Sequence, residues 1–182
     1  MNNPNFAIQK YVTGSDIKRV RKTLRLTQKK FAELVGVSKA TMERWETKED
    51  KITGPVVLLL KILEDHPEYV TKIQIPDKKY GLRMWYMHEQ EICTLIDVDE
   101  LRKRVRIKNY TDNIMFQAFG NLKEPTYEDY EVFLESRCFP KSRDKMKLIL
   151  KDWICQFYDP LMIIQKTEGR MAEDHFWIQI ER

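Results

Sequence analysis

The stretch LTQKKFAELVGVSKATMERWETKED, residues 26–50, contains two short amphipathic segments separated by a glycine, a valine and a serine. Thr27 can cap a helix over the first segment, whose apolar stripe consists of Phe31, Leu34 and Val35. Gly36 suits a left-handed helix stop, and Ser38 can cap a helix over the second segment. The stretch therefore predicts two helices joined by a sharp turn.

Small and apolar residues in this stretch indicate how the two helices pack. Ala32 is small where the helices would cross closely, and Val37 can fill the gap between them. Met42 and Trp45 lie on the expected inner side of the second helix. We therefore expect a tightly packed pair of helices whose other residues face solvent.

Helical patterns continue on both sides of the pair. Ser15 can cap an earlier helix whose apolar positions are Ile17, Val20 and Leu24. Gly54 and Pro55 can open a later helix that reaches a break at His66 and Pro67. We predict an all-α helix-turn-helix domain of four to five helices over residues 1–74.

The pattern changes after residues 75–81, which are rich in charge and turn residues and are predicted to form a linker. Strands are expected over residues 82–89, 92–99, 104–110 and 176–180. Helices are expected after a capping box at Thr126 and Asp129, over residues 143–151, and after Asp159 and Pro160. Residues 82–182 are therefore predicted to form an α+β domain with a small antiparallel sheet.

Charge is distributed unevenly along the chain. The 182 residues carry a net charge of +4, but residues 1–80 hold 16 Lys and Arg against 10 Asp and Glu. Residues 81–182 hold 16 Lys and Arg against 18 Asp and Glu. The basic excess therefore lies in the half that contains the helix pair, which favours a polyanionic partner there.

The sequence lacks the motifs that are typical of several functional classes. No apolar run approaches the ~18 residues of a membrane-spanning helix, and a cytoplasmic protein is expected. The cysteines at 93, 138 and 155 have no metal-ligand spacing and are expected to be free, buried thiols. No glycine-rich phosphate loop is found, and the acidic residues near position 90 are expected to face solvent. We expect no catalytic residues, no metal and no cofactor.

The helix pair resembles the helix-turn-helix of the Cro and phage-repressor class, or XRE family, over residues 14–69. The resemblance rests on Thr27, Gln28, Ala32, Gly36, Val37, Ser38, Trp45 and Glu46. It implies that the helix over residues 38–48 enters the major groove of double-stranded DNA. Two copies in a homodimer would then bind an inverted-repeat operator, with these helices about 34 Å apart.

The resemblance also implies roles for individual residues. The base-contacting positions would be Lys39, Ala40, Thr41, Glu43 and Arg44. The phosphate-contacting positions would be Gln28, Lys29, Ser38, Lys48 and Lys51, and Gln28 would also brace the recognition helix. Arg44 could donate a bidentate pair to guanine, whereas Glu43 could accept from cytosine. The alternative for the whole unit is a scaffold or dimerisation module that does not contact DNA.

The run from Ser15 through residues 52–70 resembles the DNA-binding part of HigA-type and MqsA-type antitoxins. Such proteins repress their own operons and neutralise a toxin, so we expect an autorepressor. The alternatives are a phage or mobile-element regulator, or a toxin-binding module in which DNA binding is secondary. Because no zinc-binding CxxC segment precedes the domain, the toxin-binding half of MqsA-type proteins is expected to be missing.

The C-terminal domain allows several interpretations. The segment FLESRCFPKSRDKMKLIL, residues 133–150, resembles the accessory N-terminal segment of HipA-type toxin kinases and implies docking on a toxin through residues 82–182. Dimerisation or sensing is the alternative, with Arg137, Arg143 and Asp144 as a structural ion-pair cluster. Single-stranded nucleic acid could also stack where Trp85 and Tyr86 meet the basic strand over residues 102–108.

Overall fold

The computed structural model describes residues 5–48, 50–138 and 158–182. The chain divides into two compact units, Met1–Ile75 and Pro76–Arg182, and each is described by itself. The predicted fold class is confirmed, because the first unit is helical and the second combines helices with a four-stranded antiparallel sheet. The helix predicted over residues 143–151 lies outside the described residues.

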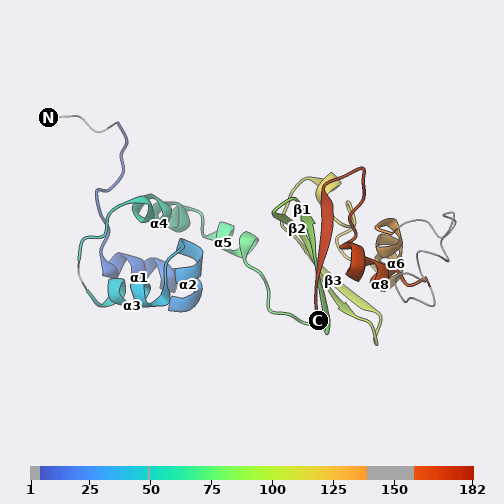
Figure 1. Ribbon diagram of the computed structural model, residues 1–182. Coiled ribbons are helices and arrows are strands. Elements are labelled where there is room, and N and C mark those ends of the chain that lie inside the picture. The colour runs from blue at the N-terminus through green and yellow to red at the C-terminus, as the bar shows by residue number, and fades with distance from the viewer. Residues whose placement is uncertain (1–4, 49, 139–157) are drawn as a thin grey trace. The chain divides into compact units, whose positions relative to one another are not determined.

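The N-terminal unit contains five described helices around one apolar core (Figure 1). They are α1 (Gly14–Thr23), α2 (Gln28–Val35), α3 (Lys39–Thr47), α4 (Pro55–Asp65) and α5 (Pro67–Ile73). Phe31 and Met42 are fully buried, and Trp45 and Leu34 pack against the same core. An isolated antiparallel β-bridge joins Val12, before α1, to Ile52, between α3 and α4. The predicted inner residues of α2 and α3 are therefore confirmed.

The start of α1 differs from the prediction. Thr13, and not Ser15, is the N-cap, and its hydroxyl accepts a hydrogen bond from the backbone N–H of Asp16. The Asp16 carboxylate accepts in return from the backbone N–H of Thr13, at 2.9 Å. This reciprocal capping box satisfies two otherwise unpaired N–H groups, so Thr13 is the more favourable cap.

The turn between α2 and α3 follows the sequence prediction. Gly36 has φ +72°, the left-handed conformation that glycine adopts without a side-chain clash. The Val37 N–H donates to the Ala32 carbonyl at 2.9 Å, which closes the end of α2. Ser38 caps α3 by accepting from the backbone N–H of Thr41 at 3.1 Å. The Gly36 conformation, the Val37 hydrogen bond and the Ser38 cap therefore fix the angle between α2 and α3.

The C-terminal unit is built on a sheet with strand order β3-β2-β1-β4 and antiparallel pairing throughout. The strands are β1 (Leu82–His88), β2 (Glu91–Asp99), β3 (Arg104–Asn109) and β4 (Phe176–Glu181). All four lie where the sequence predicted strands. Register places Trp85 opposite Leu95 on β2 and Gln179 on β4.

Helices cover one face of this sheet, which we call the inner face. They are α6 (Tyr127–Ser136), α8 (Pro160–Thr167) and the short 3-10 helix η1 (Ile114–Phe116). Figure 1 shows α6 and α8 on the same side of the sheet. The core includes Leu82, Met84 and Tyr86 from β1 together with Tyr130 from α6 and Ile163 from α8. The capping box at Thr126 and Asp129 is confirmed as the start of α6.

Alternation along β1 corrects the suggestion that Trp85 and Tyr86 share a binding surface. Tyr86 is 7% exposed in the inner-face core, stacked on Phe176. Trp85 is half-buried and, as the next residue in the strand, lies on the opposite face. Trp85 is therefore the residue of the two that shares a face with the basic side chains of β3.

Arg137 has partners among the described residues that the sequence did not predict. Its guanidinium donates to the Asp174 carboxylate at 2.6 Å and to the Gly169 carbonyl at 2.7 Å. Arg143 and Asp144 lie outside the described residues, as does most of the segment that resembles HipA-type proteins. Asp174 is therefore the acidic partner that the sequence analysis missed, because it is 37 residues away.

The thiol predictions are confirmed for two cysteines. Cys93 and Cys138 are free and buried, while Cys155 lies outside the described residues. Burial raises the pKa of both described thiols, that of Cys138 to about 11, so both are protonated at neutral pH. Across the described residues, no helix combines the length and apolar character needed to cross a membrane.

Candidate nucleic-acid interface

Helix α3 presents one polar side to solvent while its other side anchors it in the core. Met42 is fully buried and Trp45 packs against the same core. The exposed residues of α3 and its C-cap include Lys39, Ala40, Glu43, Arg44 and Lys48. The structure therefore places four of the five predicted base-contacting residues at the surface.

Thr41, the fifth predicted base-contacting residue, is half-buried. Its hydroxyl lies 2.9 Å from the hydroxyl of Ser38, and its backbone N–H donates to the same Ser38 oxygen. Thr41 therefore contributes to the cap of α3, and its hydroxyl has a partner within the protein.

Lys39 and Glu43 form an ion pair one turn apart on the exposed side, with Nζ to Oε1 at 3.1 Å. Such i,i+4 pairs contribute a few tenths of a kcal/mol, so DNA can compete for either member. The pair also offsets the negative charge of Glu43 near a phosphate backbone.

Arg44 lies beside further cations at the C-terminal end of α3. Its guanidinium forms no ion pair with another described residue. Arg44, Lys48 and Lys51 line one shallow hollow that also includes Asp50. The Lys51 ammonium stands 4.6 Å from the centroid of the Tyr11 ring, a cation–π contact that orients it. These three cations are therefore close enough to meet one stretch of an anionic ligand.

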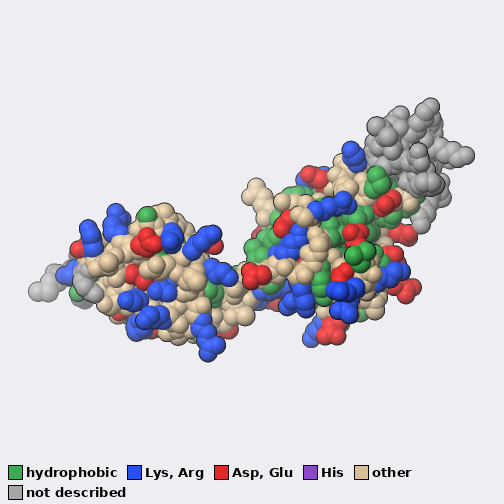
Figure 2. All heavy atoms as spheres, turned by 90° about the horizontal axis from the view of Figure 1, so that it is seen from below, with side chains coloured by type: hydrophobic (Ala, Val, Ile, Leu, Met, Phe, Trp, Pro, Cys, Tyr) green, Lys and Arg blue, Asp and Glu red, His purple; other side chains and the backbone are tan. Residues whose placement is uncertain are grey.

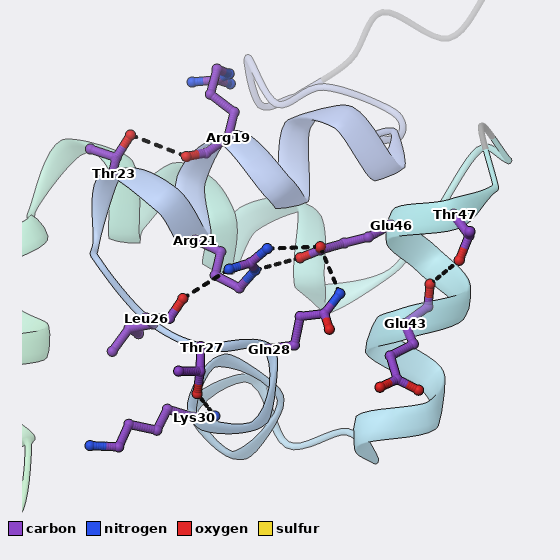
Figure 3. A network of polar contacts seen from close by, with 10 residues as sticks. All are labelled: Arg19, Arg21, Thr23, Leu26, Thr27, Gln28, Lys30, Glu43, Glu46 and Thr47. Atoms are coloured by element: carbon purple, nitrogen blue, oxygen red, sulfur yellow. Dashed lines mark hydrogen bonds and ion pairs between the residues drawn. The ribbon is translucent and has the colours of Figure 1, made fainter.

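A buried carboxylate holds α3 against α1 and α2 (Figure 3). Glu46 on α3 accepts from Arg21 Nε at 2.6 Å and from Arg21 Nη2 at 2.9 Å. The Gln28 amide donates to the same carboxylate at 3.0 Å, and Arg21 Nη1 donates to the Leu26 carbonyl at 2.9 Å. The Glu46 side chain is 5% exposed, so these charge-assisted bonds are largely shielded from water.

This network shifts the pKa of Glu46. Burial by itself would raise it, but hydrogen bonds from Arg21 and Gln28 and the charge of Arg21 outweigh burial and lower it. Glu46 is therefore ionised at neutral pH and stabilises the fold in that state. The interaction is lost as pH falls through this lowered pKa.

The network agrees with the prediction that Gln28 braces the recognition helix, although its phosphate contact stays a prediction. Lys29 lies at the exposed start of α2, one residue after Gln28. The sequence analysis missed Arg21 as the partner of Glu46, because they are 25 residues apart. The adjacent Trp45 and Glu46 were a usable signal, since a carboxylate beside a tryptophan that packs on the core needs a partner.

Positive charge surrounds this site. Figure 2 views the molecule from the side on which α2 and α3 lie in Figure 1, and Lys and Arg predominate there over the N-terminal unit. A capped helix with exposed polar residues in a basic helical unit is typical of proteins that bind double-stranded DNA. The fold and charge of this unit are thus similar to those of DNA-binding regulators.

Comparison with known families agrees with that class. Residues 5–74 match the family model described as the antitoxin component of a bacterial toxin-antitoxin system, MqsA. The match covers the helical unit and suggests an antitoxin-type regulatory role. No curated protein matches the chain.

We expect Glu46→Gln to loosen α3 and to change the pH dependence of stability. Losing the charged acceptor should cost about 1.5–3 kcal/mol in the free energy of unfolding at pH 7. Wild-type stability should fall as pH drops below the unfolded glutamate value of about 4.3, and the variant should lack this component. Urea unfolding of both proteins between pH 7 and pH 3 measures the difference. If the free energies of unfolding of the two proteins depend on pH in the same way, Glu46 is not the ionised acceptor of this network.

Proposed function

We propose that the protein is a sequence-specific transcriptional regulator of antitoxin type that binds an inverted-repeat operator as a homodimer. Its α3 enters the major groove, and binding over the promoter excludes polymerase. The observation that carries the proposal is the exposed side of α3, which carries Lys39, Ala40, Glu43 and Arg44. That side is held in place by the Ser38 cap and the Glu46 network. Chromosomal operator binding places this activity in the cytoplasm.

The proposed contacts divide into two kinds. Lys39, Ala40, Glu43 and Arg44 face the bases, with Arg44 offering the bidentate geometry that guanine accepts. Gln28, Lys29, Ser38, Lys48 and Lys51 contact phosphates. Contacts of the first kind determine sequence preference, while those of the second determine salt dependence.

We expect Arg44→Ala to lose operator preference while the protein remains folded. Arg44 is exposed, so its removal leaves the core intact. Wild type should prefer its own promoter over a scrambled duplex by ~10³ or more, and the variant should lose about 1–3 kcal/mol of that preference. Fluorescence anisotropy with both duplexes over a salt series measures it.

Two further variants complete this experiment. Lys48→Ala should weaken binding to both duplexes alike and lower the salt slope by about one unit. Lys61→Ala, which removes an exposed cation on α4, is the matched control and should leave binding unchanged. If Arg44→Ala and Lys61→Ala behave identically, α3 does not determine sequence preference.

The antitoxin part of the proposal assigns toxin binding to residues 82–182. The antitoxin family match covers residues 5–74 and supports an antitoxin role, and we assign the DNA contacts to that unit and toxin binding to the other. Co-expression with the product of the adjacent gene tests it: the full chain should restore growth and co-purify with a toxic product. If the product of the adjacent gene is not toxic, the result would favour the phage or mobile-element regulator instead.

A further inference from the structure

The sheet of the C-terminal unit has a second face, which we call the outer face. It carries Arg83, Trp85 and Met87 of β1, which alternate with the core residues of the inner face. The described helices α6 and α8 and the helix η1 all contribute to the inner-face core (Figure 1). Among described residues, the outer face is approached by the backbone at Pro76 and Lys79, at one end of the sheet.

Strand register arranges the outer face in rows across the sheet. One row runs from Lys108 through Leu95 and Trp85 to Gln179. The next row runs from Arg106 through Asp97 and Arg83 to Glu181. A further pair on the same face joins Met87 to Trp177. Trp85 and Lys108 therefore lie in one row, two strand spacings or about 10 Å apart, whereas Trp177 lies on the edge strand opposite to β3.

Three aromatic rings at this face are each paired with a cation. The Arg83 guanidinium lies 5.6 Å from the Trp85 ring centroid, and the Arg170 guanidinium lies 4.9 Å from that of Trp177. The Lys108 ammonium lies 5.0 Å from the Tyr110 ring centroid. Trp85 and Trp177 are both half-buried, so each residue keeps part of its surface accessible to solvent. A ligand with planar groups and negative charge would fit this pattern.

The charge that remains on the outer face is positive. Asp97 is buried and its carboxylate is committed to Arg83, at 2.6 and 2.8 Å. Arg104 and Arg106 are exposed on β3, and neither forms an ion pair with another described residue. Arg83, Leu95 and Asp97 are buried, so the accessible groups of this face include the two half-buried tryptophans and the guanidinium groups along β3.

We propose that the outer face of the C-terminal sheet binds single-stranded nucleic acid. Bases stack on Trp85 and Trp177, and phosphates contact Arg104 and Arg106. Duplex DNA is a poor ligand here, because its bases are already stacked inside the helix. This site is separate from α3 and does not depend on the operator-binding proposal.

Anisotropy of the full-length chain with labelled oligo(dT) and oligo(rU) of about 20 nucleotides tests the proposal. Arg104→Gln combined with Arg106→Gln should weaken binding at least about tenfold and lower the salt slope by about 1.4 units. Lys166→Gln, an exposed cation on α8, is the matched control and should bind as wild type. Tighter binding of one oligonucleotide would distinguish RNA from DNA as the ligand.

Stacking is tested separately from charge through tryptophan emission. Oligonucleotide binding should quench the emission of wild type, and Trp85→Phe should retain the affinity but lose part of the quenching. Trp85→Leu should weaken binding, with circular dichroism as the check on folding. Absence of binding at low salt, or equal binding by the arginine double variant and the Lys166→Gln control, would overturn the proposal. Binding of a protein partner by this face, with no binding of either oligonucleotide, would also overturn it.

Discussion

Gly14→Ala is expected to destabilise the N-terminal unit by about 3 kcal/mol or more. A Cβ at Gly14 would lie 2.8 Å from the Lys48 carbonyl oxygen and still closer to that of Trp45. Both contacts are with backbone atoms at the end of α3, so no flexible side chain can move aside. Alanine normally gains about 1 kcal/mol over glycine within a helix, and the clash outweighs that gain.

The measurement is hydrogen exchange of the full-length chain, which reports α1 and α3 separately from the C-terminal unit. The α1 and α3 amides of Gly14→Ala should lose protection, and operator affinity should fall because α3 is displaced. Gly81→Ala is the matched control, since its Cβ would meet no atom within 4 Å. Wild-type protection in Gly14→Ala would show that α1 and α3 are not in close contact.

Asp97→Asn is expected to destabilise the C-terminal unit about as much as Gly14→Ala destabilises the N-terminal unit. Asp97 and Arg83 are 3% and 4% exposed and form a bidentate pair across β1 and β2. Arg83 also donates to the Pro76 carbonyl at 3.0 Å. Removing the carboxylate leaves a buried guanidinium without its counter-charge, which costs about 3–5 kcal/mol.

The double variant Arg83→Met, Asp97→Leu distinguishes this cause from general damage to the sheet. Removing both charges also removes the unpaired cation, so the double variant should be more stable than Asp97→Asn. Asp65→Asn, which breaks the exposed pair with Lys61, should cause no measurable change in urea unfolding. A double variant less stable than Asp97→Asn would indicate that the pair is a net stabilising interaction.

Features determined within a few residues could be predicted from the sequence. The caps at Thr27, Ser38 and Thr126 were predicted because each cap accepts from an N–H three residues later. The cap of α1 was misplaced because Thr13 and Ser15 are both competent, and the reciprocal bond from Asp16 decides between them. Local chemistry thus identified the elements, including the exposed side of α3.

Features formed by long-range packing could not be predicted. Glu46 and Arg21 are 25 residues apart, and nothing in their local patterns identifies them as partners. The two faces of β1 were also indistinguishable, because apolar and aromatic residues of LRMWYMH fall on both of them. Trp85 and Tyr86 differ in environment because helices pack on one face of the sheet, which a single strand does not reveal.

The charges of strand β3 also affect whether molecules of this protein aggregate through their sheet edges. Among the described strands it forms one edge of the sheet, and an edge strand can pair with the same strand of another molecule. Arg104, Arg106 and Lys108 recur at every second position along it. Aligning two such strands would bring like charges together at each step. The cations that suit an anionic ligand therefore also protect the edge from intermolecular β-pairing, even in concentrated solution.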